Sequence, residues 1–246
     1  RAKGTVEGME FVQFHPTALY HPGDHQNFLI TEAMRGYGGI LRTLDGKEFM
    51  HKYDPRLSLA PRDITARAIF NEMKMRGEDH ELLDVTHKDP EETKHHFPNI
   101  YKHCMDLGID ITKEYIPVVP AAHYMCGGIK VDLNACSSIK RLYAVGECSC
   151  TGLHGGNRLA SNSLIEAVVY ADAAARHAME HRNEYSWRED IPAWDDAGTT
   201  HPEEMVLISQ SEKEVGEIMA TYVGIVRSDL RLDRAWNRLD ILYEET

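Results

Sequence analysis

The fold is decided by residues 143–164, which read Tyr143-Ala-Val-Gly-Glu147-Cys-Ser-Cys-Thr-Gly-Leu-His154-Gly-Gly-Asn157-Arg158-Leu-Ala-Ser161-Asn162-Ser163-Leu164. This stretch begins as a short apolar run that ends in a glycine and a carboxylate, passes through a glycine-rich loop, and enters a long apolar helix pattern. The order predicts a strand, a loop and a helix N-terminus. Such a helix start offers unpaired backbone N–H groups and a positive dipole end, which suit an electron-rich ligand group. The serine and asparagine residues at 161–163 also predict a side-chain N-cap.

Composition indicates a globular chain that is acidic overall. Its 246 residues are 42% hydrophobic and 27% charged, which is enough to bury a core. The 27 Lys and Arg against 39 Asp and Glu give a formal charge of -12, which disfavours general binding to nucleic acid or to an anionic membrane. The most apolar run, residues 164–175, is broken by Glu166 and Asp172, so it predicts a buried helix. The five cysteines form no C-x-x-C pair, which indicates reduced thiols and leads us to expect a cytoplasmic protein. In a chain this acidic, any anionic ligand needs a locally positive pocket.

Two histidines lie where extended segments are expected to end. Residues 9–14 read as a strand that runs into Pro16, and this proline predicts that His15 and Thr17 lie at the strand end. His123 lies in a second extended region, residues 115–132, which contains a double glycine. A single histidine at a strand end is usually structural, so position alone does not decide the role of either residue.

Arg62 lies at the start of a clear amphipathic helix. Pro61 suits the first helical position, apolar residues recur at helical spacing, and Gly77 ends the pattern. A cation in the first turn is opposed by the helix dipole by about 0.3–1 kcal/mol, so its placement requires another reason. The sequence leaves open whether Arg62 is a solvated surface residue or part of a site.

The remaining elements predict a mixed α+β protein. We expect strands near residues 40–43 and 82–86, helices near 28–36 and 98–107, a helix that starts at 89–92 with Asp89 as its cap, and a long helix over 163–181. A linker is expected at 182–200, followed by amphipathic helices over 202–226 and 229–244. The histidines at 87, 95, 96 and 103 fit no zinc spacing, so no metal site is predicted.

Several segments, spread along nearly the whole chain, together have the pattern of a known family. They are Glu10-Phe-Val-Gln-Phe-His15-Pro-Thr17-Ala-Leu-Tyr20, Leu29-Ile-Thr31-Glu32-Ala-Met-Arg35-Gly36, Leu59-Ala-Pro-Arg62-Asp63, Val119-Pro-Ala-Ala-His123-Tyr124, Gly146-Glu147, His154-Gly-Gly-Asn157-Arg158, Ser161-Asn162-Ser163-Leu164 and Tyr222-Val-Gly-Ile-Val-Arg227. In these segments the chain resembles the succinate dehydrogenase/fumarate reductase flavoprotein family. Ala60 before Pro61-Arg62 and the loop Thr151-Gly-Leu-His154 make it similar to the L-aspartate oxidase branch.

The resemblance implies a division into four parts. Residues 1–9 would end an FAD-binding domain, 10–124 would form a substrate-capping domain of the fumarate reductase flavoprotein type, 125–194 would return to the FAD-binding α/β domain, and 195–246 would begin a helical C-terminal domain. The family's G-x-G-x-x-G motif, which holds the FAD pyrophosphate, follows no strand in this sequence. We therefore expect the chain to lack an N-terminal FAD-binding part, and to bind non-covalent FAD weakly or not at all by itself.

The resemblance also assigns roles to individual residues. Arg62 would be catalytic, as the acid or base at the substrate carbon. The substrate-binding residues would be His15, Thr31, Glu32, His123 and Arg158. The cofactor-binding residues would be Glu147, Asn162, Ser163 and Leu164. Arginine suits a dicarboxylate because its fixed fork grips a carboxylate with two hydrogen bonds.

The implied activity is the FAD-dependent oxidation of L-aspartate to iminoaspartate, with electrons passed to O2 or fumarate. In the family this is the first step of de novo NAD biosynthesis through quinolinate, so a functional link to quinolinate synthase is expected. Two alternatives stay open at this point. One is a flavoprotein subunit of succinate dehydrogenase or fumarate reductase, and the other is a non-catalytic module that binds dicarboxylates.

Overall fold

The computed structural model describes residues 3–22, 28–184, 186, 189–195 and 204–245. The chain divides into two compact units, residues 1–184 and residues 185–246. The first unit contains two β-sheets with their helices, and the second contains two helices. This mixture confirms the predicted α+β class, while the finer division into four parts stays a prediction.

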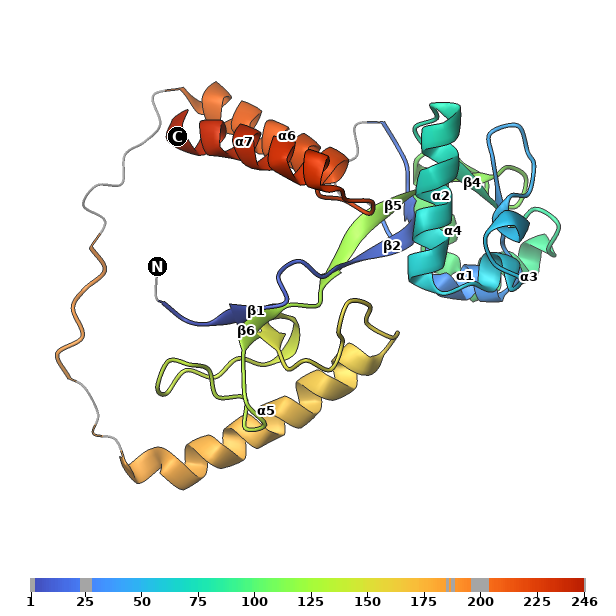
Figure 1. Cartoon of the computed structure of the whole chain (residues 1–246). Coiled ribbons are helices and arrows are strands. Elements are labelled where there is room, and N and C mark those ends of the chain that lie inside the picture. The colour runs from blue at the N-terminus through green and yellow to red at the C-terminus, as the bar shows by residue number, and fades with distance from the viewer. Residues whose placement is uncertain (1–2, 23–27, 185, 187–188, 196–203, 246) are drawn as a thin grey trace. The chain divides into compact units, whose positions relative to one another are not determined.

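The described residues form the strands and helices shown in Figure 1. The strands are β1 (Val6–Glu7), β2 (Val12–Leu19), β3 (Ile40–Arg42), β4 (Glu81–Asp84), β5 (Ile116–Met125), β6 (Gly128–Lys130) and β7 (Ser149–Cys150). The α-helices are α1 (Glu32–Gly36), α2 (Arg62–Arg76), α3 (Pro90–His96), α4 (Pro98–Asp106), α5 (Asn162–His181), α6 (Met205–Tyr222) and α7 (Asp229–Glu245). Single-turn helices lie at η1 (Met50–Lys52), η2 (Leu57–Leu59), η3 (Gly146–Cys148) and η4 (Arg182–Glu184).

The larger sheet has four antiparallel strands in the order β2-β5-β4-β3. Helix α2 packs on β2 and also contacts β5 and β4, and Figure 1 shows α1 to α4 gathered around this sheet. One apolar core joins the sheet to these helices, with Leu19, Leu83 and Ile116 from the strands and Met34 and Ile69 from the helices almost fully buried. The residues on β2, β5 and α2 are therefore carried by elements that share one packed core.

Local sequence signals explain where the helices begin and end. Asp89 caps α3 by accepting hydrogen bonds from the backbone N–H groups of residues 91 and 92, as its place before a proline predicts. Helix α2 ends at Gly77, whose φ of 69° is in the left-handed region that favours glycine. The predicted helix over 28–36 is shorter than expected, because only residues 32–36 are helical and Leu29 pairs with Ala18 in an isolated bridge.

The prediction that His15 and Thr17 lie at a strand end is wrong. Strand β2 continues through Pro16 to Leu19, and its register with β5 shifts between His15 and Ala18. The shift leaves one extra residue on β2, so the missing N–H of Pro16 is accommodated at a β-bulge. A second shift on the partner strand leaves His123 as the extra residue, because Gln13 pairs with Tyr124 and Phe14 pairs with Ala122.

The smaller sheet has the order β1-β6-β7 and lies before the long helix α5 in the chain. Strand β1 pairs with β6 in the antiparallel sense, and β6 pairs with β7 in the parallel sense. The helix predicted for the end of residues 143–164 is present as α5, but the strand predicted at their start is not. Tyr143 forms only an isolated bridge with Cys136, the chain then turns at η3, and the short strand β7 lies within the predicted loop.

The second unit consists of α6 and α7, which pack against each other. Their bounds confirm the two helices predicted for the end of the chain. Part of the predicted linker over 182–200 lies outside the described residues. Within the described part of the chain, no helix is both long and apolar enough to cross a membrane.

Candidate functional site

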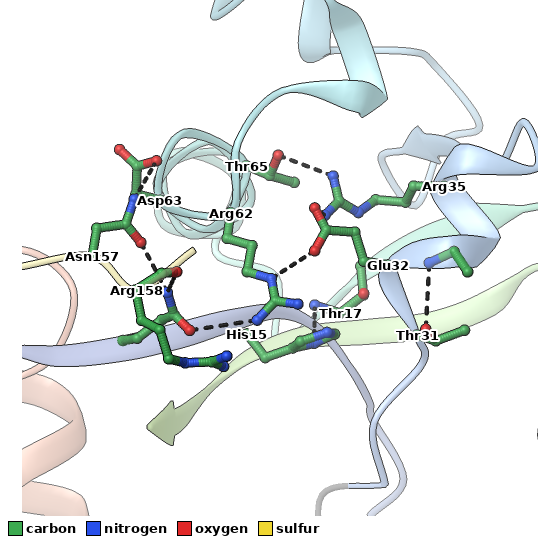
Figure 2. A network of polar contacts seen from close by, with 12 residues as sticks. His15, Thr17, Thr31, Glu32, Arg35, Arg62, Asp63, Thr65, Asn157 and Arg158 are labelled. Atoms are coloured by element: carbon green, nitrogen blue, oxygen red, sulfur yellow. Dashed lines mark hydrogen bonds and ion pairs between the residues drawn. The ribbon is translucent and has the colours of Figure 1, made fainter. Parts of the chain in front are cut away.

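Arg62 is held in place at the first turn of α2. Its Nε donates to Glu32 Oε2 at 2.6 Å and its Nη1 donates to Gln13 Oε1 at 3.4 Å, as Figure 2 shows for the labelled residues. The side chain is only 15% exposed. Its Nη2 makes no hydrogen bond within the described residues. Arg62 is therefore not the solvated surface arginine that the sequence left open, and its outer nitrogen is available to a ligand.

Arg35 supports the segment that leads into α2. It is 1% exposed, and its Nη1 donates to the carbonyl oxygens of Ser58 at 2.7 Å and Ala60 at 3.2 Å. Its Nη2 lies 3.3 Å from Glu32 Oε1, an ion-pair distance without the alignment of a hydrogen bond. Arg35 thus fixes the backbone just before Arg62 and also approaches the same carboxylate.

Glu32 lies between these two arginines at the start of α1. Thr31 caps that helix, because its Oγ1 accepts from the backbone N–H of Ala33 at 3.3 Å. Burial of the Glu32 carboxyl opposes ionisation, but the hydrogen bond and charge of Arg62, with the charge of Arg35, outweigh it and lower its pKa. Glu32 is therefore an anion that joins two cations. The Thr31 hydroxyl donates to no acceptor among the described residues, so its hydrogen can serve a ligand.

His15 and His123 face each other from the two bulged strands. Their rings lie 5.4 Å apart in an edge-to-face arrangement. Burial and the nearby charges of Arg62, His123 and Arg35 lower the pKa of His15 to about 4, so its imidazole is neutral at pH 7. The Thr17 backbone N–H donates to His15 Nδ1 at 3.2 Å, which places the ring proton on Nε2. Burial and the charges of Arg158 and Arg62 also lower the pKa of His123.

Arg158 comes from the loop before α5 and is cross-linked to β2. Gln13 Nε2 donates to Asn157 Oδ1 at 2.9 Å and to the carbonyl oxygen of Arg158 at 2.5 Å, and Asn157 Nδ2 donates to Asp63 Oδ1 at 3.1 Å. The Arg158 guanidinium lies 4.4 Å above the Tyr124 ring, and Nη1 donates to Ser163 Oγ at 3.2 Å. Its Nε is buried and has no hydrogen-bond partner in the described residues. A buried guanidinium with an unused donor is a candidate anion site.

The structure therefore brings together the four basic side chains named from the sequence. The charges of Arg62 and Arg158 both lower the pKa of His123, and the charges of Arg62 and His123 both lower the pKa of His15. Glu32 and Thr31 lie at the same place, at the start of α1. Their proposed roles are not tested by this proximity, but the proximity is the geometry that a small dianion requires.

The predicted cofactor residues lie at the η3 turn and at the start of α5. Glu147 Oε1 accepts from the backbone N–H of Met125 at 3.0 Å, and Asn162 and Ser163 open the helix. The predicted side-chain N-cap is wrong, because Ser161 has a φ of 67° and its side chain makes no capping hydrogen bond. The positive end of α5 is thus left without a side-chain cap.

These residues fit one edge of a flavin. An uncapped helix N-terminus suits the part of the ring that becomes electron-rich, and the first two turns of α5 add an apolar surface. That surface is formed by residues that are each more than half exposed, namely Leu164, Ile165, Val168 and Val169. The fit covers the ring edge only, because no phosphate-binding glycine loop follows a strand in this sequence.

Some of the residues at this site were not predicted. Gln13 links Arg62 to the loop of Arg158, and Tyr124 supports the Arg158 guanidinium. Gln13 could have been found, since it lies two residues before His15 on one strand and alternation gives both the same face. Tyr124 follows the bulged His123, so alternation alone could not have placed it. Arg35 had no signal beyond its place on a short helix.

Comparison with known proteins identifies the class of this site. Residues 1–164 match the family described as FAD binding domain, so the chain belongs to that family of flavoprotein domains. Among individual relatives, it is 51% identical over 246 residues to the L-aspartate oxidase of Vibrio cholerae, covering 100% of this chain and 46% of that protein. It is 50% identical over 245 residues to the L-aspartate oxidase of Pseudomonas aeruginosa, covering 100% of this chain and 45% of that protein.

Solved structures of fumarate reductases have a similar fold. A quinol-fumarate reductase with menaquinol molecules matches with a TM-score of 0.80 at 32% identity, covering 98% of this chain and 46% of that chain. An E. coli quinol fumarate reductase matches with a TM-score of 0.77 at 30% identity, covering 99% of this chain and 46% of that chain. The chain thus spans less than half the length of these relatives.

Proposed function

We propose that the chain is part of an FAD-dependent L-aspartate oxidase, and that it supplies the substrate-binding groups and one edge of the flavin site. The observation that carries the proposal is the cluster of Arg62, Arg158, His15 and His123 around one point. The relatives named as L-aspartate oxidases, at about half identity, support this choice of substrate. The reaction would convert L-aspartate to iminoaspartate, the first step of NAD biosynthesis through quinolinate.

Substrate binding would use the two arginines and the two histidines as donors. Among the described residues, the buried Nε of Arg158 and the Nη2 of Arg62 have no hydrogen-bond partner, so each arginine can bind one carboxylate. His15 would donate from Nε2, since its Nδ1 already accepts from the backbone. At any pH above its pKa the imidazole is neutral, and because its tautomer is fixed, Nε2 always carries the proton and can donate it.

FAD, when bound, supplies the acceptor for the hydride that leaves the substrate Cα. Around it, Glu147 would bond the ribityl chain, and residues 162–164 would present backbone amides to the ring. In the opposite direction, with fumarate, Arg62 would give a proton to the substrate carbon. A guanidinium has a pKa above about 12, so such a transfer requires a site closed to water.

The contacts of Glu32 supply a path by which Arg62 could regain a proton. Glu32 accepts from Arg62 at 2.6 Å and its other oxygen lies 3.3 Å from Arg35. A carboxylate between two guanidiniums can accept a proton from one and pass it to the other. The same carboxylate would orient the substrate amino group during aspartate oxidation.

The test is the full-length, FAD-loaded protein with either Arg62→Ala or, as a matched control, Arg67→Ala on the exposed side of the same helix. Arg62→Ala should lower fumarate reduction by at least about a hundredfold, the range typical of lost acid catalysis, with flavin content unchanged. Arg67 pairs with Asp63 at 52% exposure, so its loss should have little effect. Near-normal fumarate reduction by Arg62→Ala would refute the assignment.

Two alternatives are kept, and a specific observation favours the first. The solved structures that match are fumarate reductases, which favours a flavoprotein subunit of that kind. Turnover of L-aspartate, compared with turnover of succinate, separates the two enzymes, since only the oxidase should use aspartate. A non-catalytic dicarboxylate module would bind succinate tightly without FAD, which calorimetry on this chain would detect.

Some further properties belong to the same proposal. We infer that FAD is held non-covalently and only weakly by this chain alone, because the residues present cover one edge of the ring. We also propose a cytoplasmic location and a functional link to quinolinate synthase. Association of this chain with a purified quinolinate synthase would test the latter.

A further inference from the structure

A buried hydrogen-bonded group fastens the glycine-rich loop to helix α5. Glu166, on the second turn of α5, has a side chain that is 1% exposed, and His154 in the loop has a side chain that is 5% exposed. His154 Nε2 and Glu166 Oε2 are 2.7 Å apart, and the Thr151 hydroxyl donates to the other oxygen of Glu166. Both carboxylate oxygens therefore hold the loop, at two points three residues apart.

The loop requires such a restraint because its backbone is permissive. Gly152 and Gly155 both have positive φ, 83° and 52°, and Gly156 follows directly. Glycines lower the cost of alternative conformations, so a loop with three of them is poorly defined by its backbone alone. Arg158 lies two residues after Gly156, and the direction of its guanidinium depends on how this loop is fixed.

His154 is also linked to Arg158, because both contact the ring of Tyr124. The His154 ring lies 5.6 Å from the Tyr124 ring, at an angle of 88°. The Arg158 guanidinium lies over the Tyr124 ring at 4.4 Å. Tyr124 is 9% exposed, so this cation–π contact is largely shielded from water, where such contacts are strongest.

We propose that Glu166 and His154 are positioning residues for Arg158, and that they set the affinity for a dicarboxylate without touching it. The proposal rests on the function proposed above, in which Arg158 binds a substrate carboxylate. Glu166 fixes the loop at residues 151 and 154, and His154 fixes the Tyr124 ring on which the guanidinium lies. Replacing a whole buried pair of this kind by apolar residues of similar volume is often neutral for stability, so stability alone is a weak reason for a buried carboxylate here.

The experiment uses the full-length, FAD-loaded protein and malonate, a dicarboxylate that cannot be oxidised to an alkene. Its dissociation constant is measured from the change in flavin absorbance on binding. Glu166→Gln keeps the side-chain volume and removes the charge, and should weaken malonate binding by about tenfold, as for the loss of a shielded cation–π contact. The matched control is Glu180→Gln, the same change at an exposed position of the same helix, which should leave binding unchanged.

A second background separates positioning from general damage. In an Arg158→Leu protein, Glu166→Gln should change malonate binding by less than about twofold, because the group that it positions is gone. An equal loss in both backgrounds would overturn the proposal, since a merely structural role would not depend on Arg158. His154→Gln is the second variant, should Glu166→Gln fail to fold, and is expected to behave in the same way.

Failure of this inference can be told apart from failure of the proposed function. L-Aspartate turnover by the unmodified protein decides the function, and the malonate measurements decide the positioning. A protein that binds malonate and shows the dependence on Arg158, but does not oxidise L-aspartate, supports the positioning and refutes the oxidase. A protein that binds no dicarboxylate overturns both.

Discussion

Glu81 gives a prediction whose sign and size follow directly from its surroundings. This residue lies on β4, is fully buried, and neither carboxyl oxygen has a hydrogen-bond partner among the described residues. Burial, with the charges of Glu78 and Glu72, raises its pKa from an ordinary value of 4.5 to about 8. The nearby Arg76 acts in the opposite direction but does not cancel the effect.

A raised pKa for a carboxyl makes stability depend on pH. The folded state prefers the neutral form of the Glu81 carboxyl. The contribution of this residue to the free energy of unfolding is therefore fully present below about pH 4.5 and is lost as the pH rises through about 8. The difference between the ordinary pKa of 4.5 and the raised pKa of about 8 corresponds to at most about 5 kcal/mol in the free energy of unfolding. Glu81→Gln is neutral at every pH and has nearly the same shape, so it should match the natural protein at pH 5 and exceed its stability at pH 9.

The assay is the thermal midpoint of both proteins between pH 5 and 9. For a protein of this size, 1 kcal/mol moves the midpoint by about 2–4 °C, so the variant should gain at least about 5 °C at pH 9. Glu91→Gln is the control, since its side chain is 83% exposed and the change should have no pH-dependent effect. A midpoint difference that is the same at pH 5 and pH 9 would refute the reasoning.

Further predictions concern the site and the helix ends. Since the pKa of His15 is about 4, malonate affinity of the FAD-loaded protein should show no titration of His15 between pH 6 and 8, and His15→Gln should leave the shape of that pH profile unchanged. A step near pH 6.5 that disappears in the variant would contradict this. Asp89→Ala should destabilise the protein by about 1 kcal/mol in urea unfolding, because α3 loses its cap; no loss would mean that the cap is not used. Gly77→Ala should also cost about 1 kcal/mol, because alanine is strained at a φ of 69°, whereas Gly36→Ala, at an exposed helical position with nothing close to its Cβ, should cost nothing.

The helices could be predicted from the sequence because their signals are local. Asp89 before a proline, and Gly77 after an amphipathic run, each act within one turn of their own helix. The helix expected over 28–36 is shortened to residues 32–36 for a non-local reason, since Leu29 pairs with Ala18 in a bridge. Local propensity could not show that a strand edge competes for this residue.

The site could be predicted only in part, because its geometry depends on two strand irregularities. Pro16 indicates that β2 is irregular, but it suggests a strand end rather than a bulge. The bulge at His123 has no sequence signal of its own, since it exists only in the pairing of β5 with β2. Gln13 and Tyr124 were missed for related reasons, because each acts through a partner that lies more than thirty residues away in the sequence.

The charges of the site explain why it suits an anion. Both histidines have a lowered pKa and are counted as neutral, and the charged groups that act on them are three arginines, Arg35, Arg62 and Arg158, and two carboxylates, Glu32 and Glu147. Arg35 and Arg62 share Glu32, whereas Arg158 forms no ion pair with any described residue. The site is thus positive on balance within a chain that is acidic overall. Because unpaired buried charges are costly, the arrangement favours an anionic ligand over a neutral one.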